Sequence, residues 1–404
     1  MRVFLGGLLL SAVASADTIV ALNEQGIAHL RAGRAQAAVD AFEAALAKTQ
    51  GSTVLKRNTA AALAALAESK RKQDLPGQAI DDLDRAIELH PTRLAYRVQR
   101  GRARYELNRD ADRFFAREDF VYVLERDPDH FASLINLGQI SYVERRLDEA
   151  VKFWTRALEL MPDDPDIRTR LQRARRELEV EAAYLERRSP QFLVRWGKKI
   201  PESDAVAVFN ACEEAYSELC QRFQHYPDNA VTVVTIYTPK EFQAATRQHG
   251  WVAGLSDGTI RLALGKGRNR LAAARRTIFH EYAHHLIRRI APKTPGWLHE
   301  GLAQLAEGKS VARARVRLRG SRSLHPASLS VRILGQRDPR AVSHFYDLAL
   351  AFTGFLQEAG GSAGILKLLM ALKSGKDEFA ALREIYGESR SELFSRWRQQ
   401  LQAG

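Results

Sequence analysis

A repeat of about 34 residues runs through the first half of this 404-residue chain and constrains its fold more than any other feature. Each copy carries a small, a large and a small residue at i, i+4 and i+7, and three of the four copies then end in proline. The positions are Ala38, Phe42 and Ala45; Ala79, Leu83, Ala86 and Pro91; Ala116, Phe120, Val123 and Pro128; and Ala150, Trp154, Ala157 and Pro162. Residues at this spacing share one helix face, so each helix can nest against a partner. The spacing predicts an all-α superhelix of about four helix pairs.

The pattern resembles the tetratricopeptide repeat (TPR), whose period and Gly, Ala, aromatic and Pro positions it shares. Glycines mark the preceding helix of three units: Gly26, Gly101 and Gly138. The best match runs from Phe131 to Pro162. We assign residues 17–188 to this array, with a polar helix from Asp166 to Arg187 as its cap. The resemblance implies a protein or peptide partner on the concave face, although no residue identifies that partner.

Residues 1–16 have the composition of a secretory signal peptide. Arg2 supplies the positive start, an apolar run follows from Val3 to Ala14, and Ala14-Ser15-Ala16 forms an A-x-A cleavage site. The run is too short to span a bilayer, and no later segment is a transmembrane candidate. A buried N-terminal helix is the alternative. We expect an exported, soluble protein cleaved after Ala16, which would be periplasmic in a Gram-negative bacterium.

The net charge of +13 makes the chain basic. A basic surface suits an anionic polymer, but no nucleic-acid fold motif occurs, so we favour a solvated surface and expect no nucleic-acid partner. Four arginines alternate with apolar residues and would share one face of a strand: Arg313, Arg315, Arg317 and Arg319. Such a face could bind an anionic polymer such as cell wall, or it could be a charged edge that prevents aggregation.

The second half of the chain has a different pattern, which predicts an α+β domain at 189–310 and a helical subdomain at 311–404. We expect strands at 192–196, 230–237 and 258–264, the last of them an edge strand, and helices at 203–223 and 240–249. The stretch from Gly361 to Trp397 is expected to be helical, with turns at Gly375 and Gly387.

The candidate chemistry lies in a His-Glu-x-x-His motif within a predicted helix. Positions i and i+4 share a helix face, so His280 and His284 can point an imidazole nitrogen each at one metal ion. Glu281 would lie beside that ion and could take a proton from a water. Catalytic zinc takes a third protein ligand, and the candidate is Glu300, early on a second helix after Pro292 and Pro295 break the first.

Together the motifs at 280–284 and 297–303 resemble the gluzincin branch of zinc metallopeptidases, the peptidase-MA-like domains often joined to tetratricopeptide repeats. The resemblance covers roughly residues 190–400. It implies a zincin-like α+β fold and a Zn²⁺ ion with His280, His284 and Glu300 as ligands. It also implies Glu281 as general base, and an edge strand, here 258–264, that aligns an extended peptide.

The resemblance also suggests supporting residues. The family often has an acidic residue four positions after the ligand Glu; here Gln304 stands there, and its amide oxygen can accept an imidazole N–H. Related enzymes stabilise the oxyanion with a Tyr or His from C-terminal helices. We choose Tyr346 over His344, with a simply packed tyrosine as the alternative. His299 is expected to be an outer neighbour of the site or a surface residue.

The sequence thus predicts an N-terminal all-α TPR superhelix followed by an α+β zincin-like metallopeptidase domain with a helical C-terminal subdomain. The predicted function is an exported zinc metallopeptidase acting on peptides or proteins. Two alternatives remain open: a catalytically weak or inactive TPR scaffold with a structural or vestigial zinc site, and a basic binder of cell-wall polymer.

Overall fold

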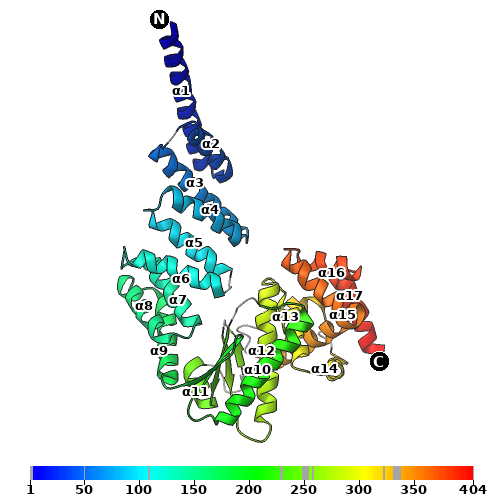
Figure 1. Ribbon diagram of the computed structural model, residues 1–404. Helices are drawn as coiled ribbons and strands as arrows, with labels where there is room; N and C mark the ends of the chain where they lie inside the picture. The colour runs from blue at the N-terminus through cyan, green and yellow to red at the C-terminus, as the bar shows by residue number, and fades with distance from the viewer. Residues whose placement is uncertain are drawn as a thin grey trace. The chain divides into compact units, whose positions relative to one another are not determined.

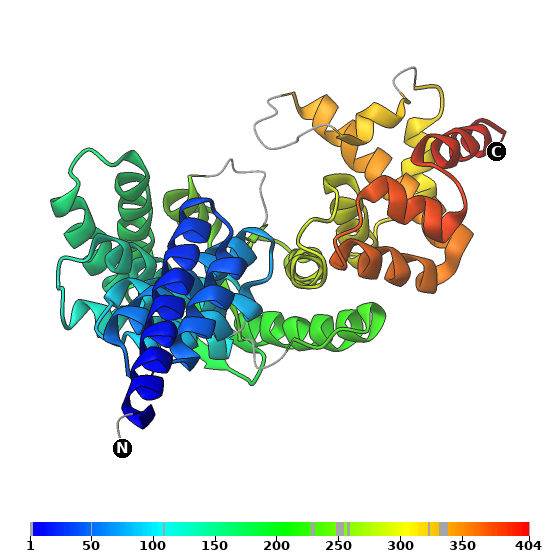
Figure 2. The same cartoon turned by 90° about the horizontal axis from the view of Figure 1, so that it is seen from above.

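The computed structural model describes residues 3–49, 51–107, 110–227, 231–247, 254–256, 259–321, 324–330 and 338–403. The chain divides into two compact units, Met1–Ala174 and Arg175–Gly404. In Figures 1 and 2 the first unit runs from blue to teal and the second from green to red. We describe each unit by itself.

The first unit consists of consecutive helix pairs, as the repeat predicts. The pairs are α1 (Val3–Arg31) with α2 (Ala35–Ala47), α3 (Thr53–Lys72) with α4 (Pro76–Leu89), α5 (Leu94–Glu106) with α6 (Asp110–Leu124), and α7 (Phe131–Val143) with α8 (Leu147–Leu160). Helix α9 (Pro165–Glu181) follows. The small and large repeat positions are buried in the cores of these pairs, so the predicted TPR superhelix is confirmed.

Glycine in the first helix of three pairs makes room for an aromatic ring on the second helix. A Cβ atom at Gly138 would lie 2.3 Å from the Trp154 ring. The corresponding contacts are 2.5 Å for Gly26 with Phe42 and 2.8 Å for Gly101 with Phe120. Such distances are too short for real atoms, so the ring occupies the space that a side chain at the glycine would need. This explains why the repeat pairs a glycine with a later aromatic residue.

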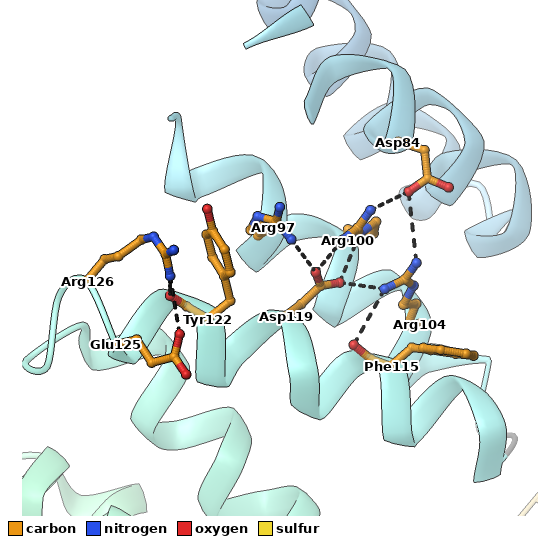
Figure 3. Close-up of polar contacts among 9 residues, drawn as sticks. All are labelled: Asp84, Arg97, Arg100, Arg104, Phe115, Asp119, Tyr122, Glu125 and Arg126. Atoms are coloured by element: carbon orange, nitrogen blue, oxygen red, sulfur yellow. Dashed lines mark hydrogen bonds and ion pairs between the residues drawn. The ribbon is translucent and has the colours of Figure 1, made fainter. Parts of the chain in front are cut away.

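A buried carboxylate fastens the third pair together (Figure 3). The Asp119 side chain is 2 % exposed, and Arg97, Arg100 and Arg104 of α5 surround it. Arg104 Nη1 lies 2.9 Å from Asp119 Oδ2, and Arg100 binds both carboxylate oxygens. Arg100 also donates to Asp84 of α4 at 2.6 Å. The cluster therefore links α4, α5 and α6, which belong to two successive units.

The second unit is built on a mixed five-stranded sheet in the order β1-β2-β3-β5-β4. The strands are β1 (Leu185–Arg188), β2 (Phe192–Trp196), β3 (Thr232–Tyr237), β4 (Gly254–Ser256) and β5 (Ile260–Ala263). Strands β2, β3 and β5 are parallel, and β1 and β4 pair antiparallel at the two edges. The predicted strands are confirmed, except for positions 230 and 258, which lie outside the described residues.

One strand prediction is wrong. Strand β5 was expected at the edge of the sheet, but it lies between β3 and β4. Residues Ile260 to Leu262 pair with β4, so this stretch has no free edge for an added peptide strand. The short β4 is the edge strand instead.

Helices make up most of the other described residues of the unit. They are α10 (Glu202–Phe223), α11 (Pro239–Thr246), α12 (Arg270–Ile290), α13 (Gly296–Ala306), α14 (Val311–Leu318), the 3-10 helix η1 (Pro326–Ser330), α15 (Pro339–Lys373), α16 (Glu378–Tyr386) and α17 (Arg390–Ala403). One hydrophobic core runs from the sheet to α17, so the α+β part and the helical C-terminal part form one folding unit. Gly375 and Gly387 have positive φ and end α15 and α16, as predicted.

Two helix predictions need correction. The cap helix was expected to reach Arg187, but α9 ends at Glu181, because residues 185–188 pair with β2 as strand β1. The arginine-rich stretch is not a strand: 311–318 form α14, so alternating positions lie on different helix faces. Arg315 pairs with Glu358 and Arg317 with Asp347, which does not support a continuous guanidinium face.

Helix α1 begins at Val3 and continues through the expected cleavage site at Ala16. Residues 1 and 2 lie outside the described part of the chain. Among the described residues, no helix has both the length and the apolar character needed to cross a membrane.

Candidate metal centre

Helix α12 presents both histidines of the motif on one side. His280 Nε2 and His284 Nε2 lie 3.0 Å apart, because the two residues are one helical turn apart. The opposite side of α12 packs into the core through residues such as Ile278, Phe279 and Tyr282. The core thus fixes the rotation of the helix, and with it the direction of the two imidazoles.

Helix α13 brings Glu300 to the same point. Glu300 Oε2 lies 3.7 Å from His280 Nε2 and 3.5 Å from His284 Nε2. Donors about 2.1 Å from a tetrahedral zinc ion lie about 3.4 Å apart, so the three separations fit one such ion. Glu300 Oε2 is a buried oxygen with no hydrogen-bond partner among the described residues. A shared cation would satisfy this oxygen, and the predicted convergence of the three side chains is present.

Close packing holds Glu300 in place. Helix α12 ends at Ile290, and a short turn containing a Thr294–Ala291 backbone hydrogen bond leads into α13. A Cβ atom at the adjacent Gly301 would lie 2.0 Å from Thr353 Oγ1 and 2.6 Å from the Ala349 carbonyl oxygen of α15. Only glycine lets α13 approach α15 so closely.

The outer nitrogen of His280 has a carboxylate partner. His280 Nδ1 lies 3.1 Å from Glu307 Oε1, and Lys309 Nζ lies 2.9 Å from the same oxygen. Burial raises the pKa of Glu307, but the hydrogen bond with His280 and the charge of Lys309 outweigh it and hold that pKa below its usual value. The Glu307 carboxylate is therefore ionised. It orients the His280 ring and makes Nε2 of His280 a stronger metal ligand.

The outer nitrogen of His284 contacts another imidazole. His284 Nδ1 lies 2.6 Å from His299 Nδ1 on α13. Burial, followed by the charges of His284 and Arg288, lowers the pKa of His299 to about 3. His299 is therefore a neutral ring that can accept a hydrogen bond from His284. This fixes His299 as an outer neighbour of the site, one of the two positions expected for it.

Glu281 lies next to the ligands and is buried. Burial raises the pKa of its carboxyl group, an effect that His280 and His284 oppose and the charge of Glu300 reinforces. A carboxylate with a raised pKa is a better proton acceptor than one in water. This environment suits the base role predicted for Glu281.

Two further residues, Gln304 and Tyr346, were predicted to support the metal site. Gln304 contacts neither imidazole: its Nε2 donates to the Tyr346 carbonyl oxygen at 2.9 Å, and both outer imidazole nitrogens have other partners. The predicted contact of Gln304 with a ligand histidine is therefore absent, and Glu307 is the residue that contacts His280 Nδ1. Tyr346 is close enough for the charges of Glu300 and Glu281 to reinforce the effect of burial and raise its pKa.

Glu307 has no predicted role, although the sequence carries a signal for it. Positions 300 and 307 are seven residues apart and share a helix face over two turns. Because α12 and α13 are antiparallel, His284 lies beside the start of α13 and His280 beside its end, where Glu307 is the C-cap residue. The spacing of four residues that predicts Gln304 therefore does not indicate Glu307.

Comparison with known proteins agrees with this arrangement. Residues 212–403 match the family model of the Peptidase MA superfamily. Residues 20–53 and 131–164 match tetratricopeptide repeat models, and the second match nearly coincides with the predicted best unit. No curated protein matches the chain.

Proposed function

Because the chain carries a Peptidase MA superfamily domain after tetratricopeptide repeats, we propose that it is a zinc-dependent metallopeptidase. The convergence of His280, His284 and Glu300 on one point carries this proposal. Two imidazole nitrogens and one carboxylate oxygen are the donor set of gluzincin-type catalytic zinc, which leaves a fourth position for water.

The mechanism follows from the placement of the side chains. Bound zinc would supply a Lewis acid for the scissile carbonyl and lower the pKa of its water toward about 7. Glu281 would accept the proton of the attacking water and deliver it to the leaving amine. The Tyr346 hydroxyl would donate a hydrogen bond to the developing oxyanion, and its raised pKa keeps it protonated for this role.

We further propose that the protein is exported after cleavage at Ala16 and that the TPR superhelix recruits a substrate or a partner protein. The signal-like composition of 1–16 supports export, and the match to repeat models supports protein binding. Edman sequencing of protein secreted by its native host should start at Asp17.

Metal removal tests the proposed activity. We expect purified protein to contain about one zinc ion per chain, to cleave a mixed peptide library, to lose cleavage on dialysis against a chelator and to regain it with Zn²⁺. Protein that retains zinc but cleaves no peptide would instead support the scaffold alternative, in which the zinc is structural. Cleavage that survives complete metal removal would contradict a zinc mechanism.

The contact between His284 and His299 predicts a graded effect on zinc affinity. If His284 Nε2 binds zinc, its Nδ1 carries the proton and donates to His299 Nδ1. His299→Leu removes this acceptor and should weaken zinc binding about 10–100-fold. His299→Asn keeps an oxygen acceptor near the same place and should bind zinc more tightly than His299→Leu. Competition with a chromophoric chelator measures both; equal affinities of the wild type and His299→Leu would refute the role.

A further inference from the structure

A pocket lies beside the beginning of the motif helix α12. It has a cavity volume of about 220 Å³ and is lined by the end of β5, the following turn and the first turns of α12. A cavity needs only about 10–15 Å³ of such volume to hold one water molecule, so this pocket has room for a side chain. Its wall residues include the small Ala263, Gly265, Ala273 and Thr277.

The pocket lies along the same face of α12 as the metal centre. Positions i, i+4, i+7, i+8 and i+11 share one face of a helix. In α12 these positions are Ala273, Thr277, His280, Glu281 and His284. At a rise of about 1.5 Å per residue, Thr277 lies about 4.5 Å along the axis from His280. The lining residue Arg270 lies about 15 Å from His280 at the same rise per residue. An extended peptide advances about 3.3 Å per residue, so side chains about two to four residues from the scissile bond would reach the pocket.

The charge of the pocket is positive. Lys266 and Arg270 are its charged lining residues, and none of the lining residues is acidic. Asp204 neutralises Arg270 through two hydrogen bonds of 2.8 and 2.9 Å. Lys266 is exposed and forms no ion pair with any residue in the described part of the chain. One uncompensated ammonium group thus remains at the pocket.

We propose that this pocket binds an acidic side chain of the peptide substrate close to the scissile bond, with the carboxylate at Lys266 Nζ. The small wall residues leave space for an aspartate or glutamate side chain, and the charge of Lys266 disfavours a basic one. This inference rests on the proposed peptidase function and adds a substrate class to it.

Binding measurements test the pocket separately from catalysis. The protein is the full mature chain with Glu281→Gln, loaded with zinc, and the probes are capped fluorescent peptide libraries that carry Glu, Gln or Lys at one fixed position. We expect the Glu library to bind about two- to fivefold more tightly than the Gln library, as for an ion pair with an exposed lysine. Adding Lys266→Met should abolish this difference, and Lys266→Glu should make the Lys library the preferred one.

Arg268→Glu is the matched control, because Arg268 is exposed in the same turn and does not line the pocket. It changes the net charge as much as Lys266→Glu and should keep the preference for Glu. No preference for Glu over Gln in the parent protein, or equal effects of the two charge reversals, would overturn the proposal. Cleavage of the same libraries by wild type tests the enzyme separately: zinc-loaded protein that binds Glu peptides but cuts none contradicts only the proposed function.

Discussion

Replacement of Glu281 by Gln should leave the zinc content unchanged and lower kcat for peptide hydrolysis by about 10²–10⁴-fold. A glutamine side chain is nearly the same size as the native glutamate, so α12 and its two histidines should stay in place. The amide cannot accept a proton at neutral pH, so the water loses its base. Zinc is measured by elemental analysis, and turnover with a quenched fluorescent peptide library.

His280→Ala is the contrasting variant. It removes a ligand and should lose both zinc and hydrolysis, whereas Glu281→Gln should lose hydrolysis alone. Because the inactive form keeps its metal site, it should also retain bound substrates for identification. If Glu281→Gln hydrolyses peptides as fast as the wild type, Glu281 is not the base.

Asp119→Asn should destabilise the repeat array by about 3–5 kcal/mol, the typical cost of breaking a buried ion pair. The Asp119 side chain is 2 % exposed, and removal of its charge leaves Arg97, Arg100 and Arg104 facing one another without their common anion. Hydrogen exchange in the full chain should show this as faster exchange of the α5 and α6 amides. The second unit supplies an internal reference, because it has its own core.

Asp84→Asn serves as the control for this prediction. Asp84 also binds Arg100, but its side chain is 42 % exposed, so its pair should contribute no more than about 1 kcal/mol. Comparable protection losses in the two variants would show that burial of Asp119 is not what stabilises the array.

Helical periodicity explains why much of the fold and the centre of the site could be predicted. The repeat positions recur at fixed spacing, and each one is buried where a helix pair requires it, as Gly138 and Trp154 show. The spacing of His280 and His284 likewise determines their separation directly, because one helical turn connects them. The position of Glu300 near these histidines follows if the two helices are antiparallel and joined by a short turn.

Features that depend on tertiary contacts could not be predicted in the same way. The contact of Glu307 with His280 depends on how far α13 runs past α12, and sequence spacing within one helix does not give that distance. Alternating arginines suggested a strand, but Ala314 and Leu318 are four residues apart and pack into the core as a helix face. Strand β5 became internal because the three-residue β4 pairs with it, and so short a strand carries little sequence signal.

The tight approach of α13 to α15 at Gly301 makes the metal centre depend on the last sixth of the chain, where α15 begins. His280 and His284 belong to a helix packed on the sheet, whereas Glu300 is braced by a partner that is synthesised much later. A premature stop codon ahead of α15 would remove this brace together with the part of the shared core that α15 to α17 supply, and would release the carboxylate. Full metal affinity would then appear only in the finished polypeptide, so an incomplete chain would be a poor hydrolase.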